Sequence, residues 1–201
     1  MKKHILIKLL FILSTTNLFS QTENINCTPY NLNGIQYCET GIPTSIIDVT
    51  GFDTQHMNEW CWAASIQAIF NYYDHNISQE RIVNETFGSI INWPAQPYQI
   101  LIALNRYWVD DDGNSFNVNA ESFDANYITA AHDLASGFPL IIGTMGHAMV
   151  LTALTYYRNI QGQGSIQSAT VRDPWPLNPR KRILSVQEWL NTSFLVRIRV
   201  N

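Results

Sequence analysis

The spacing of apolar residues changes near residue 139, and no other feature of the sequence restricts the possible fold more. Before this point, apolar side chains recur every three or four residues, which is typical of helices that bury one face. The predicted helices cover residues 60–73, 78–86, 97–107 and 124–135. Asp124 is the expected N-cap of the last helix, and Gly137 is the residue expected to stop it.

After residue 139 the pattern is that of β-strands. Strands are predicted at residues 139–144, 147–157, 165–174 and 194–200, with a short helix at 185–190. The stretch 159–164 contains two glycines and is the expected turn between the second and third strands. Because helices come first and an antiparallel sheet second, the predicted fold is α+β, with a helical N-terminal lobe and a C-terminal sheet lobe.

Residues 1–20 are typical of a secretory signal peptide, with Lys2 and Lys3 before an apolar stretch at 5–13 and the small Ser20 for cleavage. The alternative, an N-terminal membrane anchor, is less favoured because a span needs about 20 apolar residues. We therefore expect a secreted or periplasmic protein without stable membrane insertion. Within it, residues 51–201 are the predicted domain, and the polar stretch 21–50 is interpreted as an N-terminal strap or a short propiece.

The composition, with 46% apolar and 14% charged residues, is that of a globular domain. Loss of the signal peptide removes three lysines and no acid, so the formal charge falls from −4 to −7. An acidic protein is a poor partner for nucleic acid or anionic membranes, and we expect a monomer. The only basic cluster, residues 180–182, is predicted to be a solvated turn.

The chain has three cysteines, and an odd number leaves one thiol unpaired in an oxidising compartment. Cys27 and Cys38 are close in sequence, with the turn signal Asn33-Gly34 between them, so we expect them to form a disulfide. Cys61 is then the free thiol. A lone thiol in an exported protein is a liability unless it is buried or used.

Cys61 stands between Trp60 and Trp62 in the first turn of a predicted helix, for which Asn58 is the expected N-cap. A cysteine packed among aromatic residues is more often an inert core residue. It is a useful nucleophile only as a thiolate, which is favoured by the positive end of a helix and by a nearby imidazolium. The sequence must therefore supply a histidine from elsewhere in the fold.

His147 is the best candidate for that histidine. It follows the flexible sequence "GTMG" and begins an apolar strand, a position at the rim of the sheet where a cleft is expected. The remaining histidines are less suited. His4 lies in the signal peptide, and His56 is next to Gln55, too close along the chain to face the thiol easily. His75 lies in a polar connection, and His132 is expected on a helix surface. Taken alone, a histidine at a strand end is more often a satisfied rim residue.

Two further residues can complete a site around this pair. Asp173 lies across the predicted hairpin from His147, so its carboxylate can accept an imidazole N–H and fix the tautomer, while Trp175 shields this bond from water. Gln55, six residues before Cys61, can donate its side-chain NH2 to a developing oxyanion together with the Cys61 backbone N–H. Each signal alone is weak, because Asp-Pro often marks a turn and glutamine is common in loops.

Together these residues resemble the papain-like cysteine peptidases. The shared features are the spacing from Gln55 to Cys61, the Cys-Trp-Ala step at 61–63, the His-Ala start of a core strand at 147–148, and Asp173 followed two residues later by Trp175. The short length and the sequence "LASGFPLIIGTMGHAMVLTAL" are closer to the bacterial branches. Those branches include the effector proteases of plant pathogens, staphopain-type secreted enzymes and peptidases that trim double-glycine leaders.

The resemblance implies a two-lobed papain-like fold and acyl transfer without a metal or other cofactor. In this resemblance Cys61 is the nucleophile, His147 is the general acid and base, and Asp173 is the carboxylate that orients the histidine. Gln55 is the oxyanion donor, and the rings of Trp62 and Trp175 support the site. Some features depart from the family: "MNEW" replaces a glycine-rich sequence with a second cysteine, Asp173 replaces an asparagine, and the stretch before residue 50 is too short for a long inhibitory propiece. These departures leave open how activity is restrained and which substrates fit.

The sequence therefore predicts a secreted cysteine protease that hydrolyses a protein or peptide substrate. Two alternatives stay open. A deamidase or transglutaminase acting on protein glutamine would use the same cysteine, histidine and aspartate. A non-catalytic papain-like binding module would be marked by a change at one of the four site positions, and none is changed.

Overall fold

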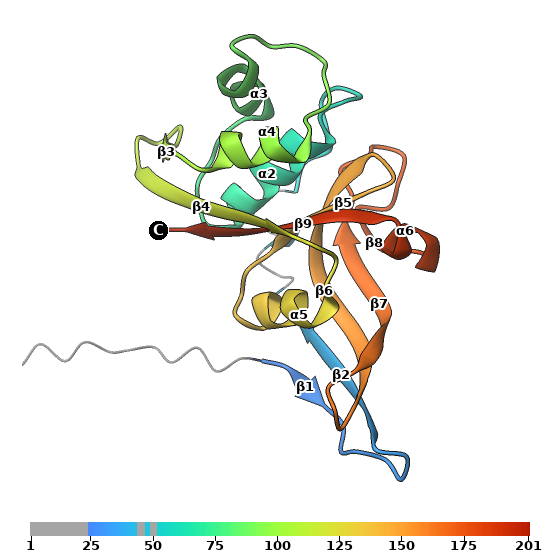
Figure 1. The fold of residues 1–201 in the computed structure, drawn as a ribbon. Coiled ribbons are helices and arrows are strands. Elements are labelled where there is room, and N and C mark those ends of the chain that lie inside the picture. The colour runs from blue at the N-terminus through green and yellow to red at the C-terminus, as the bar shows by residue number, and fades with distance from the viewer. Residues whose placement is uncertain (1–23, 44–46, 49–51) are drawn as a thin grey trace, which may run out of the picture.

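The structure is a computed structural model that describes residues 24–43, 47–48 and 52–201. The predicted signal peptide, residues 1–20, lies outside the described residues. The fold is α+β, as predicted. Figure 1 shows helices α2 (Cys61–Tyr72), α3 (Gln79–Phe87) and α4 (Pro97–Leu104) gathered at one end of a large sheet. The hairpin of β1 (Asn26–Cys27) and β2 (Ile35–Gly41) extends from the other end. No helix in the described part of the chain is both long and apolar enough to cross a bilayer.

The sheet of the described residues has nine strands, all paired antiparallel. In spatial order the main path is β1 (Asn26–Cys27), β2 (Ile35–Gly41), β6 (His147–Asn159), β5 (Leu140–Thr144), β9 (Thr192–Val200), β4 (Ser115–Phe123) and β3 (Tyr107–Val109). The branch is β7 (Gly164–Arg172), which pairs with β6 and with β8 (Lys181–Ile183). The long strand β6 thus pairs with β2, β5 and β7 and is the centre of the sheet.

The sheet and its helices share one continuous core. The helices include α2 (Cys61–Tyr72), α3 (Gln79–Phe87), α4 (Pro97–Leu104), α5 (Tyr127–Ala135) and α6 (Val186–Leu190). Helix α2 contacts β6 directly, and its apolar residues belong to the same buried cluster as those of β5, β6 and β9. The helix that begins with the free cysteine and the strand that begins with His147 are therefore held together by core packing.

Three predicted helix boundaries need correction. Asn126, not Asp124, caps α5, because its side chain accepts hydrogen bonds from the backbone N–H groups of Ile128 and Thr129. The helix predicted to reach residue 107 ends at Leu104, and residues 107–109 form β3 instead. The expected N-cap of α2 is also wrong, as described with the site below.

Other differences concern strands. The sequence prediction assigned no strand to Ser115–Phe123, which is β4. It assigned residues 21–50 to a strap or propiece, but the structure places β2 there, and β2 pairs with β6 along its whole length. The predicted solvated turn at 180–182 is wrong, because Lys181–Ile183 is strand β8 and Arg182 forms two ion pairs. The expected disulfide between Cys27 and Cys38 is present and joins paired positions of β1 and β2.

Candidate active site

Cys61 is the first residue of α2 and carries the free thiol of the described residues. The N-cap is Trp60 rather than Asn58, and no side chain caps the helix. The thiol therefore lies at the positive end of the helix, beside backbone N–H groups that have no partner within the helix. Its Sγ is half-buried and accepts a hydrogen bond of 3.4 Å from the backbone N–H of Ala148, which ties α2 to the start of β6.

The two tryptophans beside Cys61 anchor the start of α2 to the loop that follows α3. Both rings are buried. The Trp60 Nε1–H donates to the carbonyl oxygen of Ile91 at 2.8 Å, and the Trp62 Nε1–H donates to that of Trp93 at 3.2 Å. The aromatic surroundings therefore fix the position of the helix end and leave the sulfur between them accessible.

His147 is the first residue of β6 and follows a tight turn. Thr144 pairs with His147 across the β5–β6 hairpin, and the two residues between them, Met145 and Gly146, have positive φ angles of 51° and 78°. Positive φ at both central residues is the conformation of a type I′ turn, which matches the twist of paired strands. The "GTMG" sequence is thus a defined hairpin turn that fixes the backbone of His147.

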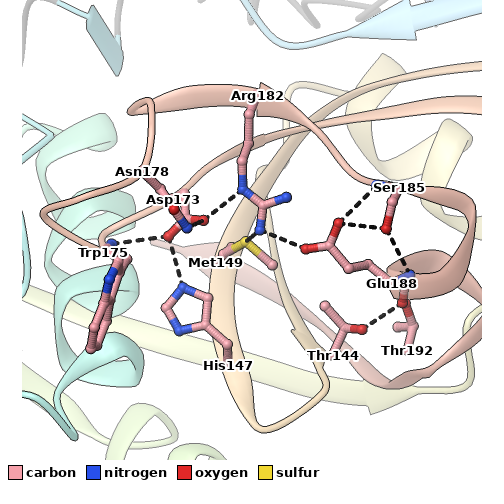
Figure 2. Close-up of polar contacts among 10 residues, drawn as sticks. All are labelled: Thr144, His147, Met149, Asp173, Trp175, Asn178, Arg182, Ser185, Glu188 and Thr192. Carbon is pink, nitrogen blue, oxygen red and sulfur yellow. Dashed lines mark hydrogen bonds and ion pairs between the residues drawn. The ribbon is translucent and has the colours of Figure 1, made fainter.

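Asp173 follows β7 directly and is fully buried next to His147. Its Oδ1 lies 2.7 Å from His147 Nε2 and accepts a second hydrogen bond of 2.9 Å from the backbone N–H of Trp175. Its Oδ2 accepts hydrogen bonds from Asn178 Nδ2 at 2.8 Å and from Arg182 Nε at 2.7 Å. Figure 2 shows the carboxylate between the imidazole and the guanidinium. Each oxygen has two donors, so the carboxylate cannot turn freely.

This environment favours charged forms of both groups. Burial lowers the pKa of His147, but hydrogen bonds and charge interactions with Asp173 and Cys61 outweigh it and raise the pKa to about 9. Burial raises the pKa of Asp173, but hydrogen bonds from His147, Trp175, Arg182 and Asn178 bring it well below its usual range. Because Asp173 occupies Nε2, the ring nitrogen left for the sulfur is Nδ1. The arrangement therefore favours an imidazolium beside the Cys61 sulfur.

Cys61 and His147 together border two adjoining cavities that form a groove. One cavity, of about 500 Å³, is largely apolar, and its walls include Trp62, Pro94, Ala95, Ile100 and Phe194. The other, of about 580 Å³, is lined by Asn58, Glu59, Pro94, Gly146, Trp175 and Asn178 as well. Cys61 and His147 thus lie where the two cavities adjoin, because both residues line both cavities.

Gln55 lies in the loop before α2, with its side chain 5% exposed. Its backbone N–H donates to the carbonyl oxygen of Pro174 at 2.9 Å, which connects this loop to the segment that carries Asp173. Its side-chain NH2 donates to the carbonyl oxygens of Met57 at 3.0 Å and Asn58 at 2.7 Å. The group predicted to bind an oxyanion is therefore engaged with its own loop in this structure.

The chain matches the model of the Peptidase_C39 like family over residues 46–195. It belongs to this family. The protein is accordingly a cysteine-type peptidase, in agreement with the papain-like resemblance of its sequence. No curated protein sequence matches the chain.

Two solved structures are similar to this C39-like peptidase. One is a double glycine motif protease from an AMS/PCAT transporter in complex with its leader peptide, with a TM-score of 0.48, 14% identity, and coverage of 74% of this chain and 89% of that one. The other is UfSP from C. elegans, with a TM-score of 0.47 and 14% identity. That alignment covers 94% of this chain and 36% of UfSP, so the chain spans about a third of the length of UfSP.

The C39-like site also contains residues that the sequence did not reveal. Asn178 and Arg182 hold the second oxygen of Asp173, and Glu188 in turn holds Arg182. The only sequence signal was the presence of basic residues shortly after Asp-Pro, which is also typical of an exposed turn. Conversely, two histidines that were set aside contact carboxylates elsewhere: His56 contacts Glu80, and His75 contacts Asp110.

Proposed function

We propose that this C39-like peptidase is a secreted protease that hydrolyses peptide bonds with Cys61 as nucleophile, His147 as general acid and base, and Asp173 as the orienting carboxylate. The observation that carries the proposal is the placement of the thiol and the imidazole in one groove, with the far nitrogen of the imidazole bonded to a buried carboxylate. This is the arrangement that nucleophilic catalysis by cysteine requires.

The reaction follows from these positions. The Cys61 thiolate attacks the peptide carbonyl carbon, and the His147 imidazolium gives its Nδ1 proton to the leaving amine as the C–N bond breaks. The neutral imidazole then takes a proton from a water molecule that attacks the thioester, and the acid product leaves as Cys61 regains its thiolate. Asp173 keeps Nε2 protonated throughout, so that Nδ1 remains the nitrogen that exchanges protons.

The proposed oxyanion site combines one donor that is free of the helix with one that must leave its present partners. The Cys61 backbone N–H is at the first position of α2 and has no partner within the helix. The Gln55 side chain supplies the second donor if it releases the carbonyl of Met57 or Asn58 when the substrate binds. Such a donor contributes about 3 kcal/mol to transition-state stabilisation. Replacing Gln55 by alanine therefore tests this role through kcat.

The proposed substrate is an extended stretch of a protein or peptide. Because Cys61 lines two adjoining cavities of about 500 and 580 Å³, there is room beside the sulfur for more than one residue of such a substrate. The cavity lined by Ile100 and Phe194 is largely apolar, which favours apolar side chains of the substrate at that position. The proposed setting is outside the cytoplasm, since the first twenty residues suit a signal peptide and the Cys27–Cys38 disulfide suits an oxidising compartment.

The deciding experiment combines covalent labelling with product analysis. The mature protein is treated with an epoxide-type thiol inhibitor, and peptide mapping by mass spectrometry locates the adduct, which we expect at Cys61. In parallel, incubation with casein should produce new N-termini, and the Cys61→Ala variant should not. Ammonia release without new N-termini would instead indicate a deamidase or transglutaminase. A folded protein that forms no adduct and cuts nothing would contradict the proposal and favour a binding module.

A further inference from the structure

Arg182 on β8 connects Asp173 to a second carboxylate, that of Glu188 on α6. Its Nε donates to Asp173 Oδ2, and its Nη2 donates to Glu188 Oε1, both at 2.7 Å. The same Nη2 lies 3.2 Å from Met149 Sδ, so the guanidinium rests against the strand that carries His147. Figure 2 shows one continuous line of polar contacts from the imidazole through Asp173 and Arg182 to Glu188.

Glu188 is itself fixed. Its Oε2 accepts hydrogen bonds of 2.8 Å from both the backbone N–H and the Oγ–H of Ser185. The Glu188 backbone N–H donates to Ser185 Oγ in return, which completes the capping box of α6. Its backbone carbonyl accepts a hydrogen bond from Thr144 Oγ, and Thr144 is paired with His147 across the β5–β6 turn. The contacts therefore return to the hairpin that holds the imidazole, which makes the arrangement a closed ring.

We propose that Arg182 and Glu188 are positioning residues that act through Asp173 and set the protonation equilibrium of His147; the inference rests on the proposed function of this site. Along the ring the charges alternate in sign, as imidazolium, Asp173 carboxylate, Arg182 guanidinium and Glu188 carboxylate. The hydrogen bonds and the charges of this series of contacts therefore both act on the imidazole of His147, through its Nε2.

The sign of each contribution follows from Coulomb's law. Asp173 favours a proton on His147, and Arg182 opposes it because two positive charges repel. Glu188 offsets part of the charge of Arg182. Removal of the Arg182 charge should therefore raise the pKa of His147, and removal of the Glu188 charge should lower it. At separations of two contacts in a partly buried site, each change is expected to be about half a unit to one unit.

The other charged groups around His147 are few in the described part of the chain. Cys61 faces it from α2, Asp173 from the segment after β7, and Glu59 lines the same groove from the loop before α2. None of these is changed in the variants proposed below. A shift in the titration of His147 can then be assigned to the Arg182–Glu188 pair.

The test compares Arg182→Gln and Glu188→Gln in the mature protein. The titration of His147 is followed by NMR of ring-labelled histidine, and the alkaline limb of kcat/KM is measured against pH. We expect both readouts to move to higher pH in Arg182→Gln and to lower pH in Glu188→Gln. A merely structural role would loosen Asp173 in both variants and give no shift of opposite sign.

Two further variants serve as controls. Arg182→Lys keeps the charge but lacks the planar fork that contacts both carboxylates, so kcat should fall several-fold without a shift of the His147 titration. Arg197→Gln is the matched control, because Arg197 also bridges two carboxylates, Asp133 and Glu121, and is 18% exposed against 20% for Arg182. It should lose similar stability to urea and leave the titration unchanged.

Titration shifts in the same direction in both glutamine variants, a shift in only one, or no shift in either overturn the inference. Failure of the proposed function is a separate result. It would be seen in the unchanged protein, as absence of both the Cys61 adduct and new N-termini, while the NMR titrations would still report on Arg182 and Glu188. If Arg182→Gln does not fold, the direction of the shift in Glu188→Gln decides alone.

Discussion

Among the described residues, two histidines contact a fully buried aspartate at nearly the same distance. His147 Nε2 lies 2.7 Å from Asp173 Oδ1, and His75 Nδ1 lies 2.9 Å from Asp110 Oδ2. Neither carboxylate has exposed side-chain surface, and the imidazoles are 24% and 18% exposed, respectively. The contact between the two side chains therefore does not distinguish a candidate active site from a structural ion pair.

The surroundings of the two pairs differ. His147 faces the free thiol and a groove, whereas the ring of His75 stacks on Phe116 with centroids 3.8 Å apart. The hydrogen bond from His75 lowers the pKa of Asp110, whereas burial raises it. Hydrogen bonds from Asn114 and Asp112 lower it further, to about 2. Asp110 thus organises its own turn, and His75 attaches the end of α2 to that turn.

The largest expected difference between the pairs concerns the histidines. Substitution of His147 by alanine should reduce kcat by about a thousandfold or more, because proton transfer to the leaving amine is lost. Substitution of His75 by alanine should leave kcat nearly unchanged and lower the free energy of unfolding by about 1–3 kcal/mol, because it removes a hydrogen bond from buried Asp110. Peptide-cleavage kinetics and urea unfolding measure both effects, and comparable losses of kcat in the two variants would refute the distinction.

The aspartates should differ less. Asp173→Asn keeps the shape of the side chain but removes the charge that supports the imidazolium, so kcat should fall, and by less than in His147→Ala, because orientation contributes less than proton transfer. Asp110→Asn should leave kcat unchanged and destabilise the fold. Steady-state kinetics with the four single variants settles the order. A larger loss for Asp173→Asn than for His147→Ala would contradict the assigned roles.

The pairs should also respond to opposite ends of the pH range. Because the pKa of His147 is raised from 6.5 to about 9, its contribution to stability is complete below pH 6.5 and is lost as the pH rises through about 9, where kcat/KM should also fall. The lowered pKa of Asp110 contributes stability above pH 3.8, which is lost as the pH falls to about 2. Urea unfolding against pH should show the alkaline loss disappear in His147→Ala and persist in His75→Ala.

The smallest effect on catalysis is expected from a region remote from both pairs. Reduction of the Cys27–Cys38 disulfide should lower the free energy of unfolding by about 3 kcal/mol in the chain-entropy model and leave kcat unchanged. Cleavage assays and urea unfolding with and without a mild reductant provide the measurement. A fall in kcat of the folded, reduced protein would show that the β1–β2 hairpin affects the site.

Much of the fold could be predicted because its main elements carry strong local patterns. Helices α2 and α3 and strands β5 and β6 lie where the apolar spacing predicted them, although the cap expected for α2 was wrong. Strand β4 was missed although its apolar and polar residues alternate as in a half-buried strand, because asparagine and glutamate are disfavoured in strands. Strand β8 is only three residues long and mostly basic, and it becomes a strand only through pairing with β7.

The sequence by itself determined which chemical groups are available: one thiol at a helix start, a histidine that opens a core strand, and an aspartate across a hairpin from it. Tertiary structure alone decided that Arg182 and Glu188 hold the far side of Asp173 and that the Gln55 amide is bonded to its own loop. The physical reason is that local patterns report which face of an element is buried, whereas contacts between charged side chains depend on how distant strands align. Such contacts leave no periodic signal in the sequence.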